Sequence, residues 1–121
     1  MDNIISIHDM SVKQEDRNKL TRHYSFTLWL TGLSASGKSS VAQKLSYELH
    51  HRGVLSYVLD GDVLRKGLNK DLRFTKKDRD ENIRRVSEVS KLLNQAGIVS
   101  ISAFISPYEK VRQEAKKNYW W

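Results

Sequence analysis

The chain has 121 residues, which is enough for one compact domain. Hydrophobic residues make up 39% and charged residues 29%, a balance that excludes a disordered or membrane-spanning chain. Because there is no cysteine, disulfides, thiolate metal sites and cysteine nucleophiles are also excluded. The formal net charge of +7 suits polyanionic partners, but lysine and arginine are scattered along the chain, which is equally the pattern of a solvated surface.

The first 24 residues form a distinct segment. They are polar and irregular, with several charged residues between positions 13 and 19. Polar terminal segments of this kind usually lie outside a domain core. We therefore expect an N-terminal arm or a short helix over residues 1–24, and one domain over residues 25–121. The arm lacks the apolar stretch of a signal peptide, and with the absence of cysteine this predicts a cytoplasmic protein.

The rest of the chain alternates between two apolar patterns. Dense β-prone runs predict strands over residues 26–31, 54–59 and 98–105. Apolar residues three and four positions apart predict helices between them, and Gly53 and Gly97 stand where helices should end. The helices are expected over residues 39–51 and 78–95, with loops or a short helix over 63–77 and a last helix from Pro107 to about Asn118.

The two longer predicted helices each have an apolar face. For residues 39–51 it consists of Val41, Leu45 and Leu49, with Ala42 on the flank. For residues 78–95 it consists of Ile83, Val86, Val89, Leu92 and Leu93.

The order strand, helix, strand, helix, strand, helix predicts an α/β fold with a parallel sheet. In such sheets ligands bind outside the carboxyl ends of the strands. Three segments follow those ends: residues 32–39, residues 60–62 and residues 105–108. We therefore expect the three segments to converge on one site.

A phosphate-binding P-loop follows the first predicted strand, with the pattern G-x-x-x-x-G-K-S. Its glycines permit a tight turn whose N–H groups face phosphates, and the next helix adds the positive end of its dipole. Lys38 should reach the β- and γ-phosphates, and the Ser39 hydroxyl should bind Mg²⁺. A purely structural glycine turn is the weaker alternative, because the pattern lies between a strand and a helix. The P-loop comprises Gly32, Leu33, Ser34, Ala35, Ser36, Gly37, Lys38 and Ser39.

Two aspartates, Asp60 and Asp62, close the second predicted strand. Taken alone, Asp-Gly pairs are turn formers. At a strand end adjacent to a P-loop they have another use, since one carboxylate can hold Mg²⁺ through water and one can accept the proton of an attacking hydroxyl. The sequence leaves open which aspartate has which role.

Arg65, Arg79, Asn82 and Arg85 lie in the segment that should cover an acceptor. The planar guanidinium suits anionic groups because it donates several hydrogen bonds at once. The competing interpretation of Arg79 and Arg85 is a solvated helix face, paired with the acidic residues at positions 78, 80 and 81. Phe74 is a candidate for stacking on a base.

Four motifs, in this order, resemble the adenylyl-sulfate kinase family. The resemblance covers about residues 24–117, and four ordered motifs are far more specific than a P-loop alone. The motifs are Gly32-Leu33-Ser34-Ala35-Ser36-Gly37-Lys38-Ser39-Ser40, then Leu59-Asp60-Gly61-Asp62 with Arg65 and Gly67-Leu68-Asn69-Lys70-Asp71-Leu72, then Asp78-Arg79-Asp80-Glu81-Asn82-Ile83-Arg84-Arg85-Val86, and finally Phe104-Ile105-Ser106-Pro107-Tyr108.

The resemblance implies a P-loop NTPase-type three-layer α/β/α fold and a reaction of sulfate assimilation. ATP would phosphorylate the 3′-hydroxyl of adenosine 5′-phosphosulfate, with Mg²⁺ as a second cofactor. Separately, no nucleic-acid partner is expected, because only the net charge would support one, and no membrane partner is expected, because the apolar runs are too short to span a bilayer. Lys38, Asp60 and Asp62 would be catalytic, Ser39 and Asp60 would serve the metal, and ATP contacts would extend to Ser40. The acceptor would be bound by Asp60, Asp62, Arg65, Phe74, Arg79, Asn82, Ile105 and Ser106.

The chain departs from the family pattern in length and at position 73. Family kinase domains run to roughly 200 residues, so we expect about three strands here, and the later strands and basic lid would be missing. The strand at 26–31 then becomes an exposed apolar edge, which predicts poor solubility or self-association, with a homodimer among the assemblies, and little kinase activity. Arg73 stands where the family commonly has glycine, and it would strain the loop before Phe74 if that glycine needed a positive φ.

Two other hypotheses stay open besides a kinase of this family. One is a nucleotide-binding module without catalysis, and the other is a P-loop kinase that acts on a different small hydroxyl acceptor.

Overall fold

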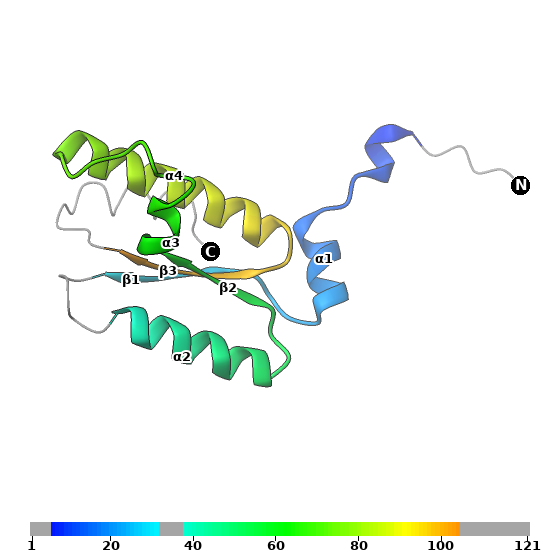
Figure 1. The fold of residues 1–121 in the computed structure, drawn as a ribbon. Coiled ribbons are helices and arrows are strands. Elements are labelled where there is room, and N and C mark those ends of the chain that lie inside the picture. The colour runs from blue at the N-terminus through cyan, green and yellow to red at the C-terminus, as the bar shows by residue number, and fades with distance from the viewer. Residues whose placement is uncertain (1–5, 32–37, 105–121) are drawn as a thin grey trace, which may run out of the picture.

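The computed structural model describes residues 6–31 and 38–104, which form three layers (Figure 1). The central layer is a parallel sheet of β1 (Thr27–Thr31), β3 (Val99–Phe104) and β2 (Ser56–Asp60), in that spatial order. Helix α2 (Lys38–His51) covers one face of the sheet and α4 (Lys76–Gln95) covers the other. The predicted three-layer α/β/α arrangement with three parallel strands is therefore confirmed.

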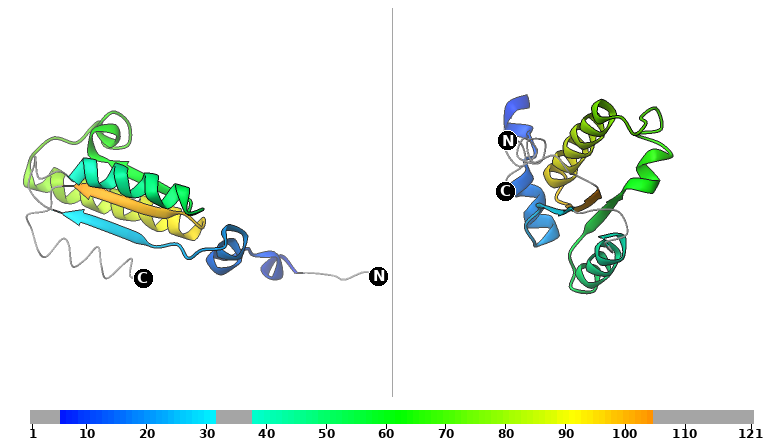
Figure 2. Two further views of the ribbon diagram at one scale, coloured as in Figure 1. Left: turned by 90° about the horizontal axis from the view of Figure 1, so that it is seen from below. Right: turned by 90° about the vertical axis from the view of Figure 1, so that its left-hand side faces the viewer.

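The remaining elements lie at the two ends of the sheet. The short helix α3 (Gly61–Arg65) follows β2 directly, at the carboxyl end. A 3-10 turn η1 (Ile7–Met10) and helix α1 (Gln14–Thr21) precede the sheet, and α1 lies near the amino end of β1 (Figure 2). The Arg17 guanidinium Nη1 donates to the carbonyl of Gln95 at 2.8 Å, which ties α1 to the end of α4.

The strand order corrects one expectation about the site. The sequence placed the end of β2 on a strand adjacent to the P-loop strand, but β3 lies between β1 and β2. The register pairs Thr31 with Phe104 and Asp60 with Ala103. The chain leaves one strand position open as it passes from β1 through α2 to β2, and it fills that position when it returns through α4. The three carboxyl ends are still level, but Asp60 is two strands away from the end of β1.

Local signals set the bounds of α4. The helix begins at Lys76, earlier than the predicted position 78, because the Thr75 hydroxyl caps it by accepting a hydrogen bond from the Asp78 N–H at 3.1 Å. It ends before Gly97, whose φ of +90° is the left-handed conformation that glycine adopts without strain.

The buried face of α4 is more polar than predicted. Ile83 and Val86 are buried as expected, but the prediction for Leu92 was wrong, because its side chain is 63% exposed. The buried face continues instead through three small or polar residues at helical spacing. Small side chains allow a helix to approach a sheet closely, and here one buried hydroxyl lies 3.1 Å from a hydroxyl of β3, Ser90 to Ser102. The three buried residues are Ser87, Ser90 and Asn94.

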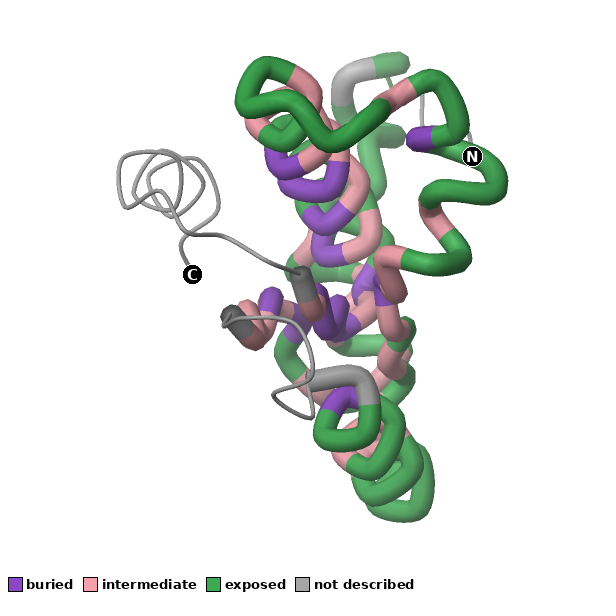
Figure 3. The backbone as a smooth tube through the Cα atoms, turned by 60° about the vertical axis from the view of Figure 1, so that its left-hand side comes forward, coloured by how far each residue is buried: buried purple, intermediate pink, exposed green. Residues whose placement is uncertain are grey.

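The opposite face of the sheet is covered less completely. In α2, Ala42 is fully buried, whereas Val41 is 54% exposed and was wrongly placed on the apolar face. Leu45 and Leu49 are half-buried. Figure 3 shows the result: most of the buried residues lie in α4 and the sheet, and most residues of α2 are exposed.

Strand β1 lies at an edge of the described sheet. It pairs with β3 on one side, and no strand among residues 6–31 and 38–104 pairs with its other side. Its three central residues, Leu28, Trp29 and Leu30, are half-buried. The apolar edge predicted from the sequence is therefore present in the described sheet. No helix within the described ranges is both long enough and apolar enough to cross a membrane.

Candidate functional site

The site lies where the three parallel strands end. Helix α2 begins at Lys38, directly after the glycine-rich segment that follows β1, so the order strand, glycine-rich sequence, helix required of a P-loop is present. Ser40 is exposed in the first turn of α2. The other predicted nucleotide contacts, Gly32 to Gly37 and the side chains of Lys38 and Ser39, lie outside the described residues, as do Ile105 and Ser106.

Asp60 and Asp62 stand at the carboxyl end of β2. Asp60 Oδ1 accepts a hydrogen bond from the Asp62 N–H at 2.8 Å and thereby caps helix α3. The turn interpretation and the site interpretation are therefore compatible, because the cap uses one oxygen of Asp60 and leaves the other available. The Asp62 side chain is exposed and has no partner within the described part of the chain.

Arg65 and Phe74 form a stacked pair beside these aspartates. The guanidinium carbon of Arg65, at the end of α3, lies 4.6 Å from the ring centroid of Phe74, a cation–π distance. The Phe74 side chain is 63% exposed, although an aromatic ring of this size is usually buried in a core. The pair places an accessible aromatic surface next to a positive charge, which suits a base attached to an anionic group.

Arg79 and Asn82 are three residues apart on α4, so they share a face of the helix. The Arg79 side chain is exposed and has no partner among the residues that the structure describes, so the predicted pairing with its acidic neighbours is not found. Asn82 Oδ1 accepts a hydrogen bond from Asn69 Nδ2. With its oxygen engaged in this way, Asn82 retains the amide N–H groups as donors for a ligand.

Asn69 has a structural role that the sequence did not reveal. Its side chain is 1% exposed, and its backbone N–H donates to the Leu64 carbonyl at 2.7 Å. It therefore connects α3 to α4 beneath the exposed residues. Asn69 belongs to the motif Gly67-Leu68-Asn69-Lys70-Asp71-Leu72, but the sequence does not show that its side chain is buried.

Arg85 belongs to a network of charged groups, as its competing interpretation predicted. It donates to Glu81 on its own helix and, unexpectedly, to Asp71 in the loop before Phe74. Hydrogen bonds from Arg84 and Arg85 lower the pKa of Glu81 to about 2, and the bond from Arg85 lowers the pKa of Asp71. Reciprocally, Asp71 and then Glu81 raise the pKa of Arg85.

The loop around Arg73 is free of the strain considered above. Arg22 is the one non-glycine residue with a positive φ among the described residues, so Arg73 does not need a glycine conformation. Its backbone N–H donates to Asp78 Oδ2 at 2.8 Å, which fixes the chain just before Phe74.

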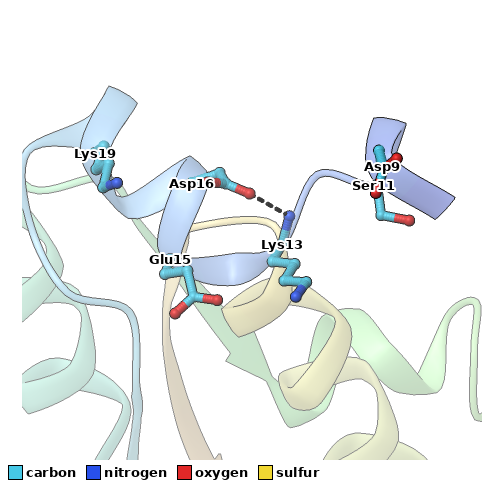
Figure 4. A pocket seen from close by; sticks show the side chains of 6 residues that line it. All are labelled: Asp9, Ser11, Lys13, Glu15, Asp16 and Lys19. Carbon is cyan, nitrogen blue, oxygen red and sulfur yellow. Dashed lines mark hydrogen bonds between the residues drawn. The ribbon is translucent and has the colours of Figure 1, made fainter. Parts of the chain in front are cut away.

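A separate hollow lies on the N-terminal segment, near η1 and α1 (Figure 4). The Asp16 carboxylate accepts from the Lys13 N–H there, and both signs of charge line the space. This hollow lies beyond the amino ends of the strands, whereas the candidate site lies at their carboxyl ends. The reason is that α1 packs near the last residues of α4. No group of three or more His, Asp or Glu within the described ranges is arranged to hold a metal ion.

The fold and the site together define the class of protein. A glycine-rich sequence between β1 and α2, a three-layer α/β/α sheet and acidic residues at a second strand end are the features of a P-loop NTPase fold. The chain belongs to the adenylylsulphate kinase family, whose profile matches residues 24–120.

Individual relatives agree with this family. Adenylyl-sulfate kinase of Staphylococcus carnosus is 50% identical over 113 residues, which are 93% of this chain and 57% of the relative. The enzyme of Pseudomonas entomophila is 54% identical over 105 residues, 87% of this chain and 50% of the relative. The chain thus spans about half the length of the curated relatives it matches.

Solved structures give the same result. APS kinase of Mycobacterium tuberculosis in complex with AMPPNP and APS has a TM-score of 0.75 and 49% identity, over 78% of this chain and 54% of the other. A hexameric APS kinase from Thiobacillus denitrificans has a TM-score of 0.74 and 33% identity, over 85% of this chain and 22% of the other.

Proposed function

We propose that this chain binds ATP and adenosine 5′-phosphosulfate and transfers the γ-phosphoryl group to the 3′-hydroxyl of the second nucleotide. The observation that supports the proposal is the stacking of Arg65 on the exposed Phe74 ring, which follow β2 in a chain that belongs to the adenylylsulphate kinase family. The solved structure of a kinase with 49% identity contains AMPPNP and APS, which supports the same pair of substrates for this chain.

The acceptor is proposed to lie between α3 and α4. Phe74 would stack on the adenine with the face of the ring that Arg65 leaves open, and Arg79 would meet the phosphosulfate. Asn82 would donate from its amide, because its oxygen is already engaged by Asn69. Ile105 and Ser106, which follow β3, are proposed to complete this pocket.

The donor is proposed to lie at the P-loop. Residues 32–37 and Ser40 would hold the phosphates of ATP, with Lys38 on the β- and γ-phosphates. The open oxygen of Asp60 and the hydroxyl of Ser39 are oxygen ligands of the kind that Mg²⁺ takes. When bound there, the ion neutralises charge on the transferred phosphoryl group.

The proposed reaction requires one proton transfer. The 3′-oxygen forms a bond to the γ-phosphorus while the bond from that phosphorus to the bridging oxygen of ADP breaks. The proton of the 3′-hydroxyl passes to a carboxylate, and we assign it to Asp62, because Asp60 already uses one oxygen in the helix cap. The products are ADP and 3′-phosphoadenosine 5′-phosphosulfate. The cytoplasmic location and the homodimer expected from the sequence belong to the same proposal.

The test is turnover by the chain with Mg-ATP and adenosine 5′-phosphosulfate, followed by chromatography of the nucleotides. The 3′-phosphorylated product should form, and Asp62→Asn should lower its rate by roughly 10²–10⁴-fold, the usual value of a general base, while ATP binding persists. Binding of ATP without product would contradict the proposal and indicate a nucleotide-binding module. Turnover only with another hydroxyl acceptor would contradict the assigned substrate.

A further inference from the structure

The loop between α3 and α4, residues 66–75, presents Phe74 but has little apolar anchorage of its own. Leu68 is 44% exposed, Leu72 is half-buried, and the buried side chain of the loop is that of a polar residue, Asn69. A loop without an apolar core depends on polar contacts for its position. What holds this loop therefore decides where the Phe74 ring stands.

Arg85 of α4 makes the most extensive contact with the loop. Its Nη1 donates to the Leu68 carbonyl at 3.0 Å and to Asp71 Oδ1 at 2.7 Å, and its Nη2 donates to Asp71 Oδ2 at 3.0 Å. The last two bonds form the bidentate arrangement that suits a planar guanidinium and a carboxylate. The Arg85 guanidinium thus binds both the backbone and a side chain of the loop.

Glu81 orients the same guanidinium from the opposite side. It lies one helical turn before Arg85, and its Oε2 accepts from Arg85 Nε at 2.8 Å. With four hydrogen bonds made inside the protein, and a side chain only 23% exposed, Arg85 has little donor capacity left for a ligand. The two carboxylates also offset its charge. Arg79 has neither kind of partner among the described residues, so the two arginines are suited to different tasks.

A second contact ties the loop to the same face of α4. Asn69 donates to Asn82, which is three residues before Arg85 and so lies on the same side of the helix. The loop is therefore fixed at two points on the helix that carries Arg79 and Asn82. This arrangement sets the distance between the exposed ring of Phe74 and the polar groups of α4.

We propose that Arg85 is a positioning residue of the acceptor pocket, which holds residues 68–71 on α4 and so aligns Phe74 with Asn82. The inference rests on the function proposed above. Because Asp71 is 61% exposed, removing the Arg85 guanidinium leaves a carboxylate that water can solvate. The loss should therefore appear as a mobile loop and a weaker acceptor site, and the fold should persist.

The chain offers a matched control in the neighbouring residue. Arg84 has the same charge and donates to the same carboxylate, Glu81, with two bonds of 2.8 Å. It is 64% exposed, and within the described part of the chain it makes no hydrogen bond or ion pair with residues 66–75. Arg84→Gln and Arg85→Gln thus remove the same charge from the same helix, and only the second removes the contact with the loop.

The test uses two readouts on the wild-type chain and both variants. The hydrogen-exchange rate of residues 66–74 in the unliganded protein measures how firmly the loop is fixed. Calorimetric titration with adenosine 5′-phosphosulfate in the presence of Mg-AMPPNP measures the affinity of the acceptor pocket. Arg85→Gln should raise exchange about tenfold or more and weaken the acceptor about tenfold or more, since small misplacements of positioned groups cost one to two orders of magnitude. Arg84→Gln should stay within about twofold of wild type in both.

Asp71→Asn approaches the same contact from the loop and should reproduce both effects in milder form, because an amide accepts less strongly than a carboxylate. Equal behaviour of the two arginine variants would overturn the inference. So would weaker binding with unchanged exchange, which would indicate that Arg85 contacts the ligand directly, or faster exchange with unchanged binding. A wild-type chain that binds no adenosine 5′-phosphosulfate would contradict the proposed function instead. The hydrogen-exchange rates of residues 66–74 in the variants would then still test whether Arg85 fixes the loop.

Discussion

The two ends of the sheet use polar residues in opposite ways. At the amino end, Thr27, Asn94 and Ser100 are buried and bonded to one another: the Thr27 hydroxyl donates to Asn94 Oδ1 at 2.7 Å and accepts from the Ser100 hydroxyl at 2.9 Å. At the carboxyl end, Phe74 and Arg79 are exposed, and the arginine has no partner in the described ranges. Buried polar groups need internal partners, whereas exposed ones remain available to a ligand. One end therefore stabilises the fold, and the other is free for binding.

The amino end of the sheet should give the largest effect on stability. Asn94→Ala removes three hydrogen bonds, one accepted from Thr27 and two donated to the Phe26 and Ile98 carbonyls at 2.9 and 3.0 Å. We expect the free energy of unfolding to fall by about 3 kcal/mol, because these buried groups lose their partners. Urea unfolding of wild type and variant measures this difference in the free energy of unfolding. Gln95→Ala removes an exposed amide at the next position and should change it by less than about 0.5 kcal/mol; equal effects of the two variants would refute the comparison.

The carboxyl end should show the reverse pattern. Phe74→Ala should weaken adenosine 5′-phosphosulfate by roughly tenfold, because a stacked base is worth about 1–3 kcal/mol, and should leave the free energy of unfolding within about 0.5 kcal/mol. Titration calorimetry and urea unfolding provide the two measurements. Tyr24→Ala removes another exposed aromatic ring, 83% exposed at the amino end, and should change neither quantity appreciably. If Phe74→Ala destabilised the chain without affecting affinity, the ring would have a structural role.

Much of the fold could be predicted because its signals are local. Strand β3 is a β-prone run in which apolar residues alternate with serines, and Gly53 and Gly97, with φ of +79° and +90°, end the two long helices as expected. The order of the strands could not be read in the same way. It depends on which way the chain turns after β2, and the prediction that β2 would be adjacent to β1 failed for that reason.

The burial of polar residues was equally hard to predict. Asn94 follows Leu92 and Leu93 on α4, and a hydrophobicity pattern favours the leucines, yet Leu92 is 63% exposed and Asn94 is 8% exposed. The asparagine is stable there because its amide is hydrogen-bonded to Thr27 at the start of β1 and to the carbonyls of Phe26 and Ile98, the residues just before β1 and β3. Two of those partners, Thr27 and Phe26, are 67 and 68 residues away, so no local pattern contains them.

The candidate site residues could be identified from spacing and family motifs. The residues that hold them in position could not. Arg65, Phe74 and Asn82 were proposed from the sequence, and the structure places Arg65 over Phe74. Asn69 and Asp71 were missed as supporting residues, because the sequence does not show that the loop folds back on α4. Contacts 13 and 14 residues apart join that loop to the helix.

The two ends should also differ in their response to acid. The arginines hold the pKa of Glu81 near 2, below its ordinary value of 4.5, so its contribution to stability is complete above about pH 4.5 and is lost as the pH falls toward 2. Thermal unfolding of wild type and Glu81→Gln should therefore differ by a constant amount between pH 7 and 5, and the difference should shrink below that. The effect should be small, because Glu81 and its partners are partly exposed. The amino-end residues Thr27, Asn94 and Ser100 contain no ionisable side chain, so the difference between wild type and Asn94→Ala should not narrow in this way. If both differences narrowed together, acid would be loosening the whole fold, and the contrast between the two ends would not explain the result.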